Sequence, residues 1–148
     1  MSTGASKVTG TQILSLIPHR PPFLWVDQII SQSDTTIRTK KTFAEDLDVF
    51  RGHYPGNPLL PGVLLCEAIF QSGALLLAGS FSEEYEKMPV LTRISDARFK
   101  RRVFPGETVD IEVELIDTVS SVCVLRGKAR VGDQLALKTE FCCALIDP

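Results

Sequence analysis

Two polar residues, His53 and Glu67, lie in an otherwise apolar and proline-rich stretch of the sequence, residues 50 to 71. His53 follows Gly52 and precedes the run Tyr54-Pro55-Gly56-Asn57-Pro58, in which the prolines fix the backbone φ angle. Such a loop holds a side chain in place at little entropic cost. An imidazole and a carboxyl group that converge on one cavity are suited to general acid–base chemistry. We therefore interpret His53 as a candidate base and Glu67 as a candidate acid.

The residues around Glu67 predict a buried helix over residues 61 to 79. It begins with a proline, whose missing N–H would have no partner there, and it ends at a glycine. Between them only Glu67, Gln71 and Ser72 are strongly polar, and a helix that is apolar on every face is a buried one. An ionised carboxylate is costly to desolvate, so Glu67 must be paired, protonated or facing a cavity. Gln71, four residues further on, lies on the same face.

The start of this helix is a candidate oxyanion site. The backbone N–H groups of Gly62 and Val63 open the helix and carry the positive end of its dipole. A base, an acid and an oxyanion site together fit a reaction on an activated carbonyl compound. The residue types alone leave open that Glu67 is a structural glutamate and His53 a loop histidine with satisfied hydrogen bonds.

Composition limits the classes of protein to consider. The chain has 148 residues, about one domain, with 44% hydrophobic and 23% charged residues, which is ordinary for a globular protein. Its formal net charge of −2 argues against non-specific nucleic-acid binding. No apolar run approaches the ~20 residues needed to span a bilayer, and the polar N-terminus does not resemble a signal peptide. We expect a cytoplasmic protein without a membrane or nucleic-acid partner.

The cysteines and histidines do not predict a metal site or another cofactor. Cys66, Cys123, Cys142 and Cys143 show neither metal-ligand spacing nor a Cys-x-x-Cys pair, and adjacent Cys142 and Cys143 point to opposite faces of a strand. Cys66 has no basic neighbour that would make it a nucleophile. The chain holds only two histidines and no acids cluster around them. The second histidine, His19, is a rival titratable group, but its extended proline-rich segment is a poor scaffold for catalysis.

The remaining elements predict an α+β fold in which a sheet wraps around the central helix. We expect a disordered tail over residues 1–10 and a single domain over residues 11–148, with a short helix that Pro18 ends. An exposed loop is expected over residues 80–88. The predicted strands are 23–30 and 35–43, which form a hairpin, and 90–103, 107–119, 121–131 and 134–146, which form an antiparallel meander.

Three sets of residues carry a resemblance to a known family. They are His53-Tyr54-Pro55, Pro58, Pro61-Gly62-Val63-Leu64, Glu67-Ala68 and Gln71; then Ile17-Pro18-His19-Arg20, Pro22-Phe23-Leu24 and Val26-Asp27; then Ala97-Arg98-Phe99-Lys100-Arg101, Val103 and Pro105-Gly106. This pattern resembles the 3-hydroxyacyl-(acyl carrier protein) dehydratases of fatty acid synthesis, a family with the hot-dog fold. The resemblance covers nearly the whole chain after residue 11.

The resemblance implies a fold, an assembly and a reaction. Hot-dog sheets pair side by side in a homodimer, and the family often forms a hexamer, a trimer of dimers. The implied substrate is a (3R)-hydroxyacyl thioester on an acyl carrier protein. His53 would remove the α-proton, the Gly62 amide would stabilise the thioester oxygen, and Glu67 would protonate the departing 3-hydroxyl to give the trans-2-enoyl product. His53 and Glu67 would come from different chains, and no cofactor is needed.

The resemblance also suggests substrate and carrier contacts. Gln71 is a candidate to orient the Glu67 carboxyl, or else it makes a structural hydrogen bond. Phe70 replaces a smaller residue common in the family and would narrow the acyl tunnel, towards which Phe99 would point. The basic run Arg98, Lys100, Arg101 and Arg102 would steer an acidic carrier protein, or it is a solvated face.

Several rival readings remain open. The sibling dehydratase-isomerases usually carry aspartate where this chain has Glu67. R-specific enoyl-CoA hydratases share the spacing of Asp48 and His53, but the Gly-Asp-x-Asn-Pro setting of that aspartate is absent here. A non-catalytic acyl-thioester binding protein would have no reason to keep both His53 and Glu67. A hot-dog thioesterase is a weaker alternative.

Overall fold

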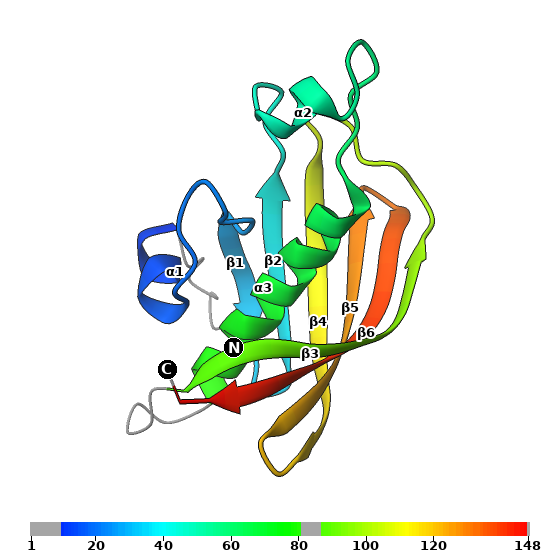
Figure 1. Ribbon diagram of the computed structural model, residues 1–148. Helices are drawn as coiled ribbons and strands as arrows, with labels where there is room; N and C mark the ends of the chain where they lie inside the picture. Colours follow the sequence, from blue (N-terminus) through cyan, green and yellow to red (C-terminus); the bar gives the residue numbers. More distant parts are fainter. Residues whose placement is uncertain (1–9, 81–86, 148) are drawn as a thin grey trace, which may run out of the picture.

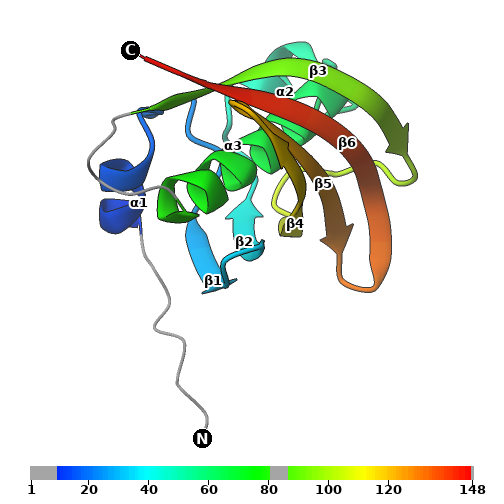
Figure 2. The same cartoon turned by 90° about the horizontal axis from the view of Figure 1, so that it is seen from below.

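The computed structural model of the chain describes residues 10–80 and 87–147. A six-stranded antiparallel sheet curves around one long helix, α3 (Gly62–Ser80), as Figures 1 and 2 show. A short helix, α1 (Gly10–Leu16), packs against α3 and the first strand, and a four-residue helix, α2 (Val49–Gly52), precedes α3. The strands are β1 (Gln28–Gln32), β2 (Thr36–Thr42), β3 (Met88–Phe99), β4 (Thr108–Val119), β5 (Val122–Val131) and β6 (Gln134–Ile146). The predicted α+β class, with a sheet wrapped around one helix, is confirmed.

The core lies between α3 and the concave face of the sheet. Along β4, Val109, Ile111 and Val113 are buried and alternate with more exposed residues, because successive side chains of a strand point to opposite faces. Each buried Val or Ile side chain stabilises the fold by about 1.5–3 kcal/mol relative to exposure. Gly127 on β5 lets the helix approach closely, since a Cβ there would overlap the Cγ2 atom of Ile69.

The prediction of a strand over residues 23–30 is wrong in its first half, because β1 begins only at Gln28. The Phe23 N–H bonds to the carbonyl of Arg20 at 2.8 Å and closes a turn. The Trp25 N–H bonds to the side-chain oxygen of Gln71 at 2.7 Å. This segment therefore pairs with a side chain of α3 instead of a neighbouring strand. A residue 46 positions away in the sequence decides its conformation.

The predicted meander of the last four strands is correct for β4, β5 and β6 and wrong for β3. The sheet order is β1-β2-β4-β5-β6-β3, so β3 pairs with β6 at one edge, whereas β2 pairs with β4. The strand predicted over residues 90–103 ends at Phe99, and the segment after it crosses to the middle of the sheet. The carbonyl of Val103 in that segment accepts the Leu60 N–H at 2.8 Å. Turn residues mark where a strand ends but do not select its next neighbour.

Two predictions fall partly outside the described residues. These are the disordered tail over residues 1–10 and the exposed loop over residues 80–88, because residues 1–9 and 81–86 are not described. The described helices include none that is both long enough and apolar enough to cross a membrane. On β6 the predicted opposite orientations of two adjacent cysteines are confirmed, since Cys143 is buried and Cys142 is half-buried.

Candidate active site

His53 is held by backbone contacts immediately after α2. Its N–H bonds to the Val49 carbonyl at 3.1 Å, and its own carbonyl accepts the Leu59 N–H at 3.0 Å. The imidazole Nδ1 lies 2.8 Å from the Leu59 carbonyl oxygen, and the ring stacks on Tyr54 with centroids 4.1 Å apart. A carbonyl oxygen can only accept a hydrogen bond, so Nδ1 carries the proton of the neutral ring. The other nitrogen, Nε2, is then the one that can accept a proton.

Glu67 lies half-buried on the second turn of α3. Its Oε1 atom accepts a hydrogen bond from Nε2 of Gln71 at 3.1 Å. The Nε2 atom of His19 lies 3.8 Å from the same oxygen. Within residues 10–80 and 87–147, no hydrogen bond to the second oxygen, Oε2, is found. One carboxyl oxygen of Glu67 is thus anchored by a hydrogen bond from Gln71.

Gln71 is fully buried, and its amide is oriented by backbone groups. Its Oε1 atom accepts the Trp25 N–H at 2.7 Å, and its Nε2 atom donates to the Phe23 carbonyl at 3.0 Å. Because a backbone N–H must meet the amide oxygen, the amide nitrogen is the atom that faces Glu67. Gln71 therefore both makes structural hydrogen bonds to the backbone and contacts the carboxyl of Glu67, and the orienting role stays a prediction.

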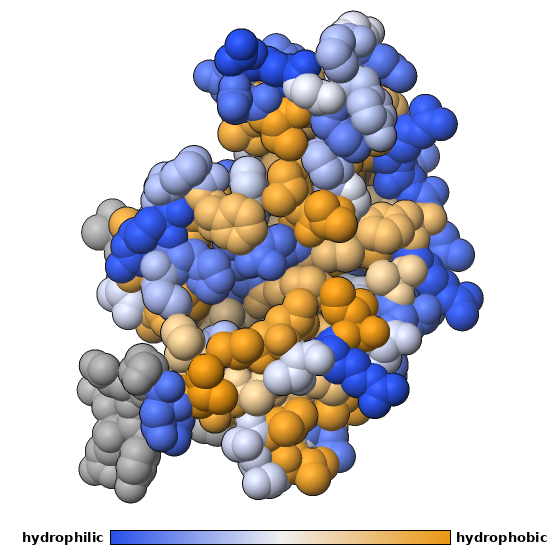
Figure 3. Space-filling model, in the orientation of Figure 1, coloured by the Kyte–Doolittle hydropathy of each residue, from blue (hydrophilic) through white to orange (hydrophobic). Residues whose placement is uncertain are grey.

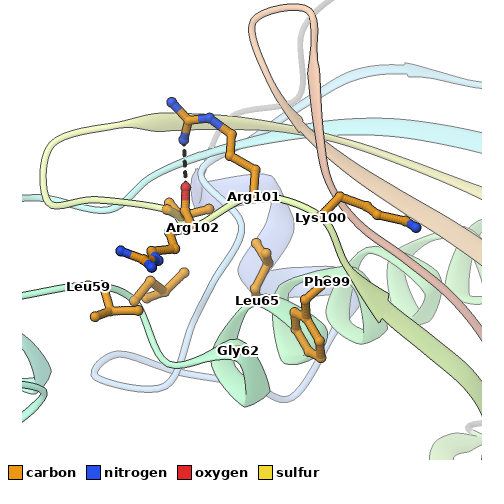
Figure 4. A pocket seen from close by; sticks show the side chains of 9 residues that line it. Leu59, Gly62, Leu65, Phe99, Lys100, Arg101 and Arg102 are labelled. Atoms are coloured by element: carbon orange, nitrogen blue, oxygen red, sulfur yellow. Dashed lines mark hydrogen bonds between the residues drawn. The ribbon is translucent and has the colours of Figure 1, made fainter.

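A cavity of about 440 Å³ lies at the N-terminus of α3. Leu59, Leu65 and Phe99 give it an apolar wall, Gly62 lies at its base, and residues 100–102 form a basic rim (Figure 4). The Phe99 ring stands so close to Gly62 that a Cβ on Gly62 would lie 2.8 Å from Cε1 of Phe99. Only glycine allows this approach. The first N–H groups of a helix have no partner within the helix, so this end of the cavity is suited to an oxyanion.

The single chain does not bring all the predicted site residues together. Gly62 and Phe99 line the cavity, whereas His53 and Glu67 do not. In the described part of the chain, no hydrogen bond or ion pair joins His53 to Glu67. Val63 is 74% exposed, so the helix is not buried on every face at its first turn as predicted, although Leu65 in the same turn is buried. Phe70 is buried against Phe141 of β6, with ring centroids 4.7 Å apart.

The basic run after β3 divides into paired and unpaired side chains. The Arg101 guanidinium donates to Gln134 Oε1 at 2.6 Å and pairs with Glu107 Oε2 at 2.8 Å. The hydrogen bond from Arg101 lowers the pKa of the Glu107 carboxyl. Arg98 pairs with a carboxylate two residues away, Asp96, at 3.2 Å. Among the described residues, no hydrogen bond or ion pair is found for the side chains of Lys100 and Arg102.

Sequence reasoning missed the position of His19. The segment around His19 was predicted to be a poor scaffold, yet Gln71 of α3 bonds to the backbone of Phe23 and Trp25 in the residues that follow it. Arg20 donates through Nη1 to the carbonyls of Ile17 at 2.9 Å and of His19 itself at 2.7 Å. Periodicity could not have placed His19 beside Glu67, but its membership of the matching N-terminal motif was a signal. No group of three metal-ligating side chains occurs in the described ranges.

Comparison with known proteins identifies the family. A model of the FabA-like domain matches residues 17–140. The chain belongs to the FabA-like domain family. Among its relatives is a protein of Chloroflexus aggregans named 3-hydroxyacyl-(acyl-carrier-protein) dehydratase FabZ, which is 41% identical over 139 residues, 93% of this chain and 95% of the relative. A protein of the same name from Symbiobacterium thermophilum is 39% identical over 135 residues, 90% of this chain and 94% of the relative.

Solved structures agree on the fold of this FabA-like domain. The dehydratase heterocomplex ApeI:P from Xenorhabdus doucetiae matches with a TM-score of 0.78 over 91% of each chain, at 16% identity. A hypothetical thioesterase from Streptococcus pneumoniae, solved with coenzyme A, matches with a TM-score of 0.65 over 90% of this chain and 91% of that one, at 10% identity. At such low identity these likenesses bear on the fold alone. The predicted hot-dog fold and the predicted family are confirmed.

Proposed function

We propose that the protein dehydrates (3R)-hydroxyacyl thioesters of an acyl carrier protein to trans-2-enoyl thioesters in fatty acid synthesis. The observation that carries this proposal is the 39–41% identity to named dehydratases over nine-tenths or more of each chain. The geometry of His53 and Glu67 supports it, because Nε2 of His53 is the nitrogen that can accept a proton and Oε1 of Glu67 is held by Gln71. No cofactor takes part in the proposed reaction.

His53 acts as the base in the proposed reaction. Its Nδ1 atom donates to the Leu59 carbonyl, which leaves Nε2 as the nitrogen that takes the α-proton of the thioester. The thioester oxygen gains negative charge as this proton leaves. The backbone N–H of Gly62 at the start of α3 stabilises that charge, helped by the positive end of the helix dipole.

Glu67 acts as the acid that completes the elimination. Its proton passes to the 3-hydroxyl group, the bond between C3 and oxygen breaks, and water leaves as the double bond between C2 and C3 forms. His53 has then gained one proton and Glu67 has lost one, so a proton must return to Glu67 before the next turnover. Gln71 orients the carboxyl through its hydrogen bond to Oε1.

We propose that a homodimer assembles the complete site. β3 lies at the edge of the sheet, so within the described residues one row of its backbone N–H and C=O groups has no neighbouring strand. Val90, Leu91 and Ile94 on this strand are exposed. In Figure 3 apolar residues form a continuous area over the face where β3 and α3 lie. Pairing of β3 with β3 of a second copy would bury these side chains. It would also allow His53 of one chain to meet Glu67 of the other.

The basic rim of the cavity supports a carrier-protein substrate. Lys100 and Arg102 lack a charged partner in the described part of the chain, so they are available to steer an acidic carrier protein to the cavity. Arg98 is weakly paired on the surface and contributes to the same positive electrostatic potential around the cavity. Arg101 contributes charge, but its guanidinium is already held by Glu107.

Phe70 supports a preference for short acyl chains. It is buried against Phe141, and the two rings fill the space between α3 and β6. An acyl tunnel that ran along α3 would meet this aromatic pair. We expect turnover to fall as the acyl chain lengthens, and we expect a smaller residue at position 70 to relieve that limit.

The structure offers little support for the alternatives. Asp48, which has the spacing seen in R-specific enoyl-CoA hydratases, pairs with Arg51 at 2.9 Å, and both side chains are exposed. Burial raises the pKa of the Cys66 thiol, which disfavours a nucleophilic thiolate. A non-catalytic acyl-binding protein stays the rival hypothesis, and it predicts saturable binding of acyl thioesters without turnover.

The test is a mixing experiment with two variants, His53→Ala and Glu67→Gln. Each should lower kcat by about 10²–10⁴-fold on 3-hydroxybutyryl and longer 3-hydroxyacyl carrier-protein thioesters, followed as enoyl formation. If each site takes His53 from one chain and Glu67 from the other, random heterodimers of the two variants regain one intact site. After denaturation and refolding of an equimolar mixture, about one site in four should be active.

The controls separate the proposed reaction from the proposed assembly. Each variant refolded alone must stay inactive, and wild type refolded alone must recover its activity. Inactive variants that recover no activity on mixing, while refolded wild type does, would contradict the two-chain site. Absence of turnover by wild type at every acyl length would contradict the dehydratase function itself.

A further inference from the structure

The N-terminal arm, residues 18 to 24, brings a second imidazole to the candidate acid. Nε2 of His19 lies 3.8 Å from Oε1 of Glu67, within ion-pairing distance and slightly beyond a direct hydrogen bond. Nε2 of Gln71 lies 3.1 Å from the same oxygen. Two side chains from different elements therefore converge on one of the two carboxyl oxygens.

The other nitrogen of His19 indicates which form of the ring is present. Nδ1 is buried and has no hydrogen-bond partner in the described parts of the chain. A buried N–H group without an acceptor is strongly disfavoured, whereas a buried nitrogen lone pair without a donor costs less. The single proton of the neutral imidazole is therefore on Nε2, the atom that faces Glu67.

This arrangement distinguishes the two oxygens of the Glu67 carboxyl. Oε1 faces two N–H donors, one on Gln71 and one on His19. Oε1 already accepts the Gln71 N–H and lies nearest to the His19 N–H, so it is the poorer place for the acidic proton, and the transferable proton is on Oε2. We propose that His19 is a positioning residue that, with Gln71, fixes the Glu67 carboxyl with Oε2 directed to the substrate. This inference rests on the dehydratase function proposed above.

The arm is built to hold His19 in this place. Arg20 bonds to the carbonyls on either side of Pro18, and Gln71 bonds to the backbone of Phe23 and Trp25. The same Gln71 amide thus secures the arm and contacts Glu67. His19 need not be mobile to reach the acid, because its Nε2 atom already lies 3.8 Å from Oε1 of Glu67, and catalytic hydrogen bonds are commonly long without substrate.

The kinetic test compares His19→Met with His19→Gln. Both replacements are unbranched and of similar length, but only glutamine can present an N–H group to Oε1 of Glu67. His19→Met should lower kcat on the order of 10- to 100-fold, because a misdirected acid delivers its proton poorly. KM should change by less than about twofold, since the contact acts on the transition state and not on substrate binding. His19→Gln should recover most of the lost kcat.

A second measurement tests the contact without turnover. The chain has two histidines, so ¹⁵N-histidine labelling gives two imidazole signals, and His53→Ala assigns them. At a pH where both rings are neutral, long-range ¹H–¹⁵N correlation should show His19 protonated on Nε2. Its Nε2 signal should shift when Glu67→Met removes the acceptor, and it should keep its position when Glu112→Gln changes a carboxylate remote from His19.

The two measurements keep the inference separate from the function it rests on. If wild type turns over and His19→Met keeps its kcat, or changes only in KM, the positioning role is wrong and the dehydratase function stands. Equal losses in His19→Met and His19→Gln with equally lowered Tm would reduce His19 to a packing residue. If wild type does not turn over at all, the function is wrong, and a His19 ring protonated on Nδ1 would overturn the contact as well.

Discussion

At the scale of single residues, two hydrogen bonds give the candidate base and acid their different chemistry. His53 donates from Nδ1 to the Leu59 carbonyl, so Nε2 is the nitrogen that acts as the base in the proposed reaction. The Gln71 amide donates to Oε1 of Glu67, so in the proposed reaction the other oxygen, Oε2, carries the acidic proton. Both contacts come from groups that are themselves held by backbone hydrogen bonds, so the two side chains are positioned before a substrate arrives.

Gly62 gives a prediction at this scale. In Gly62→Ala the added Cβ would meet Cε1 of Phe99 at 2.8 Å, and the ring, which is 52% exposed, can move away. We expect the stability to change by no more than about 1 kcal/mol, since alanine suits a helix at least as well as glycine. We expect kcat to fall, because the displaced ring enters the cavity beside the oxyanion site. Thermal unfolding and steady-state kinetics measure the two effects.

A double variant serves as the control for Gly62→Ala. Phe99→Ala removes the ring that the new methyl group displaces. Gly62→Ala combined with Phe99→Ala should therefore behave like Phe99→Ala alone, with a strong coupling between the two substitutions. An additive loss of kcat would mean that the methyl group acts on the substrate directly and not through Phe99.

At the scale of elements, the segment between β3 and β4 carries the basic rim. Arg101 fastens it by contacts to Glu107 at the start of β4 and to Gln134 at the start of β6. The Lys100 N–H also bonds to the Ala136 carbonyl at 2.8 Å. These contacts fix the backbone from which Lys100 and Arg102 extend, and they leave both of those cations available to a partner.

The Arg101–Glu107 pair predicts a pH dependence of stability. Because Arg101 lowers the folded-state pKa of Glu107, the ionised pair stabilises the fold above the usual glutamate pKa. That contribution is lost as pH falls through the lowered value. Glu107→Gln should therefore reduce the free energy of unfolding at neutral pH by no more than about 1 kcal/mol, because the pair is partly exposed. The difference from wild type should shrink in acid, measured by urea unfolding across pH.

Glu112→Gln is the matched control on the same strand. Glu112 lies on β4, is exposed, and has no ion pair among those found in the described residues. Its substitution should leave the pH dependence of stability unchanged. A Glu107→Gln variant whose difference from wild type persists at low pH would argue that Glu107 acts by packing instead of charge.

At the scale of the whole molecule, the exposed apolar strand β3 predicts the assembly. Ile94 is 48% exposed and lies opposite Phe141 of β6, so its substitution affects the free edge more than the core. Ile94→Lys should place a charge in the proposed dimer interface. We expect a folded monomer that has lost dehydratase activity, because His53 and Glu67 no longer meet. Light scattering after gel filtration gives the mass and also distinguishes a dimer from a hexamer.

Val119→Lys is the control for this change. Val119 is a 61% exposed apolar residue at the end of β4, away from the β3 edge. The same change from an apolar to a charged side chain there should leave mass and activity as in wild type. An Ile94→Lys protein that stays dimeric, or a monomer that keeps full activity, would contradict the two-chain site.

The sequence by itself determined the elements that depend on local patterns. Proline at residue 61, an apolar run and two polar positions predicted α3 and placed Glu67 and Gln71 on one face. The pattern of residues 107–119 predicted the strand that the structure shows as β4. Both predictions are correct because the spacing of apolar residues along the sequence depends on which side of a helix or strand is buried. The motif around His53 and Glu67 also sufficed to name the family.

Only the tertiary structure decided the contacts between distant segments. It placed β3 beside β6, turned residues 23–26 away from the sheet to meet Gln71, and brought His19 to Glu67. It also paired Arg101 with Glu107, so that Arg101 is no longer one of the unpaired cations of the basic run 98–102. The physical reason is common to all four. Local sequence fixes how a segment folds, whereas its neighbours are chosen by burial and hydrogen bonding across the whole chain.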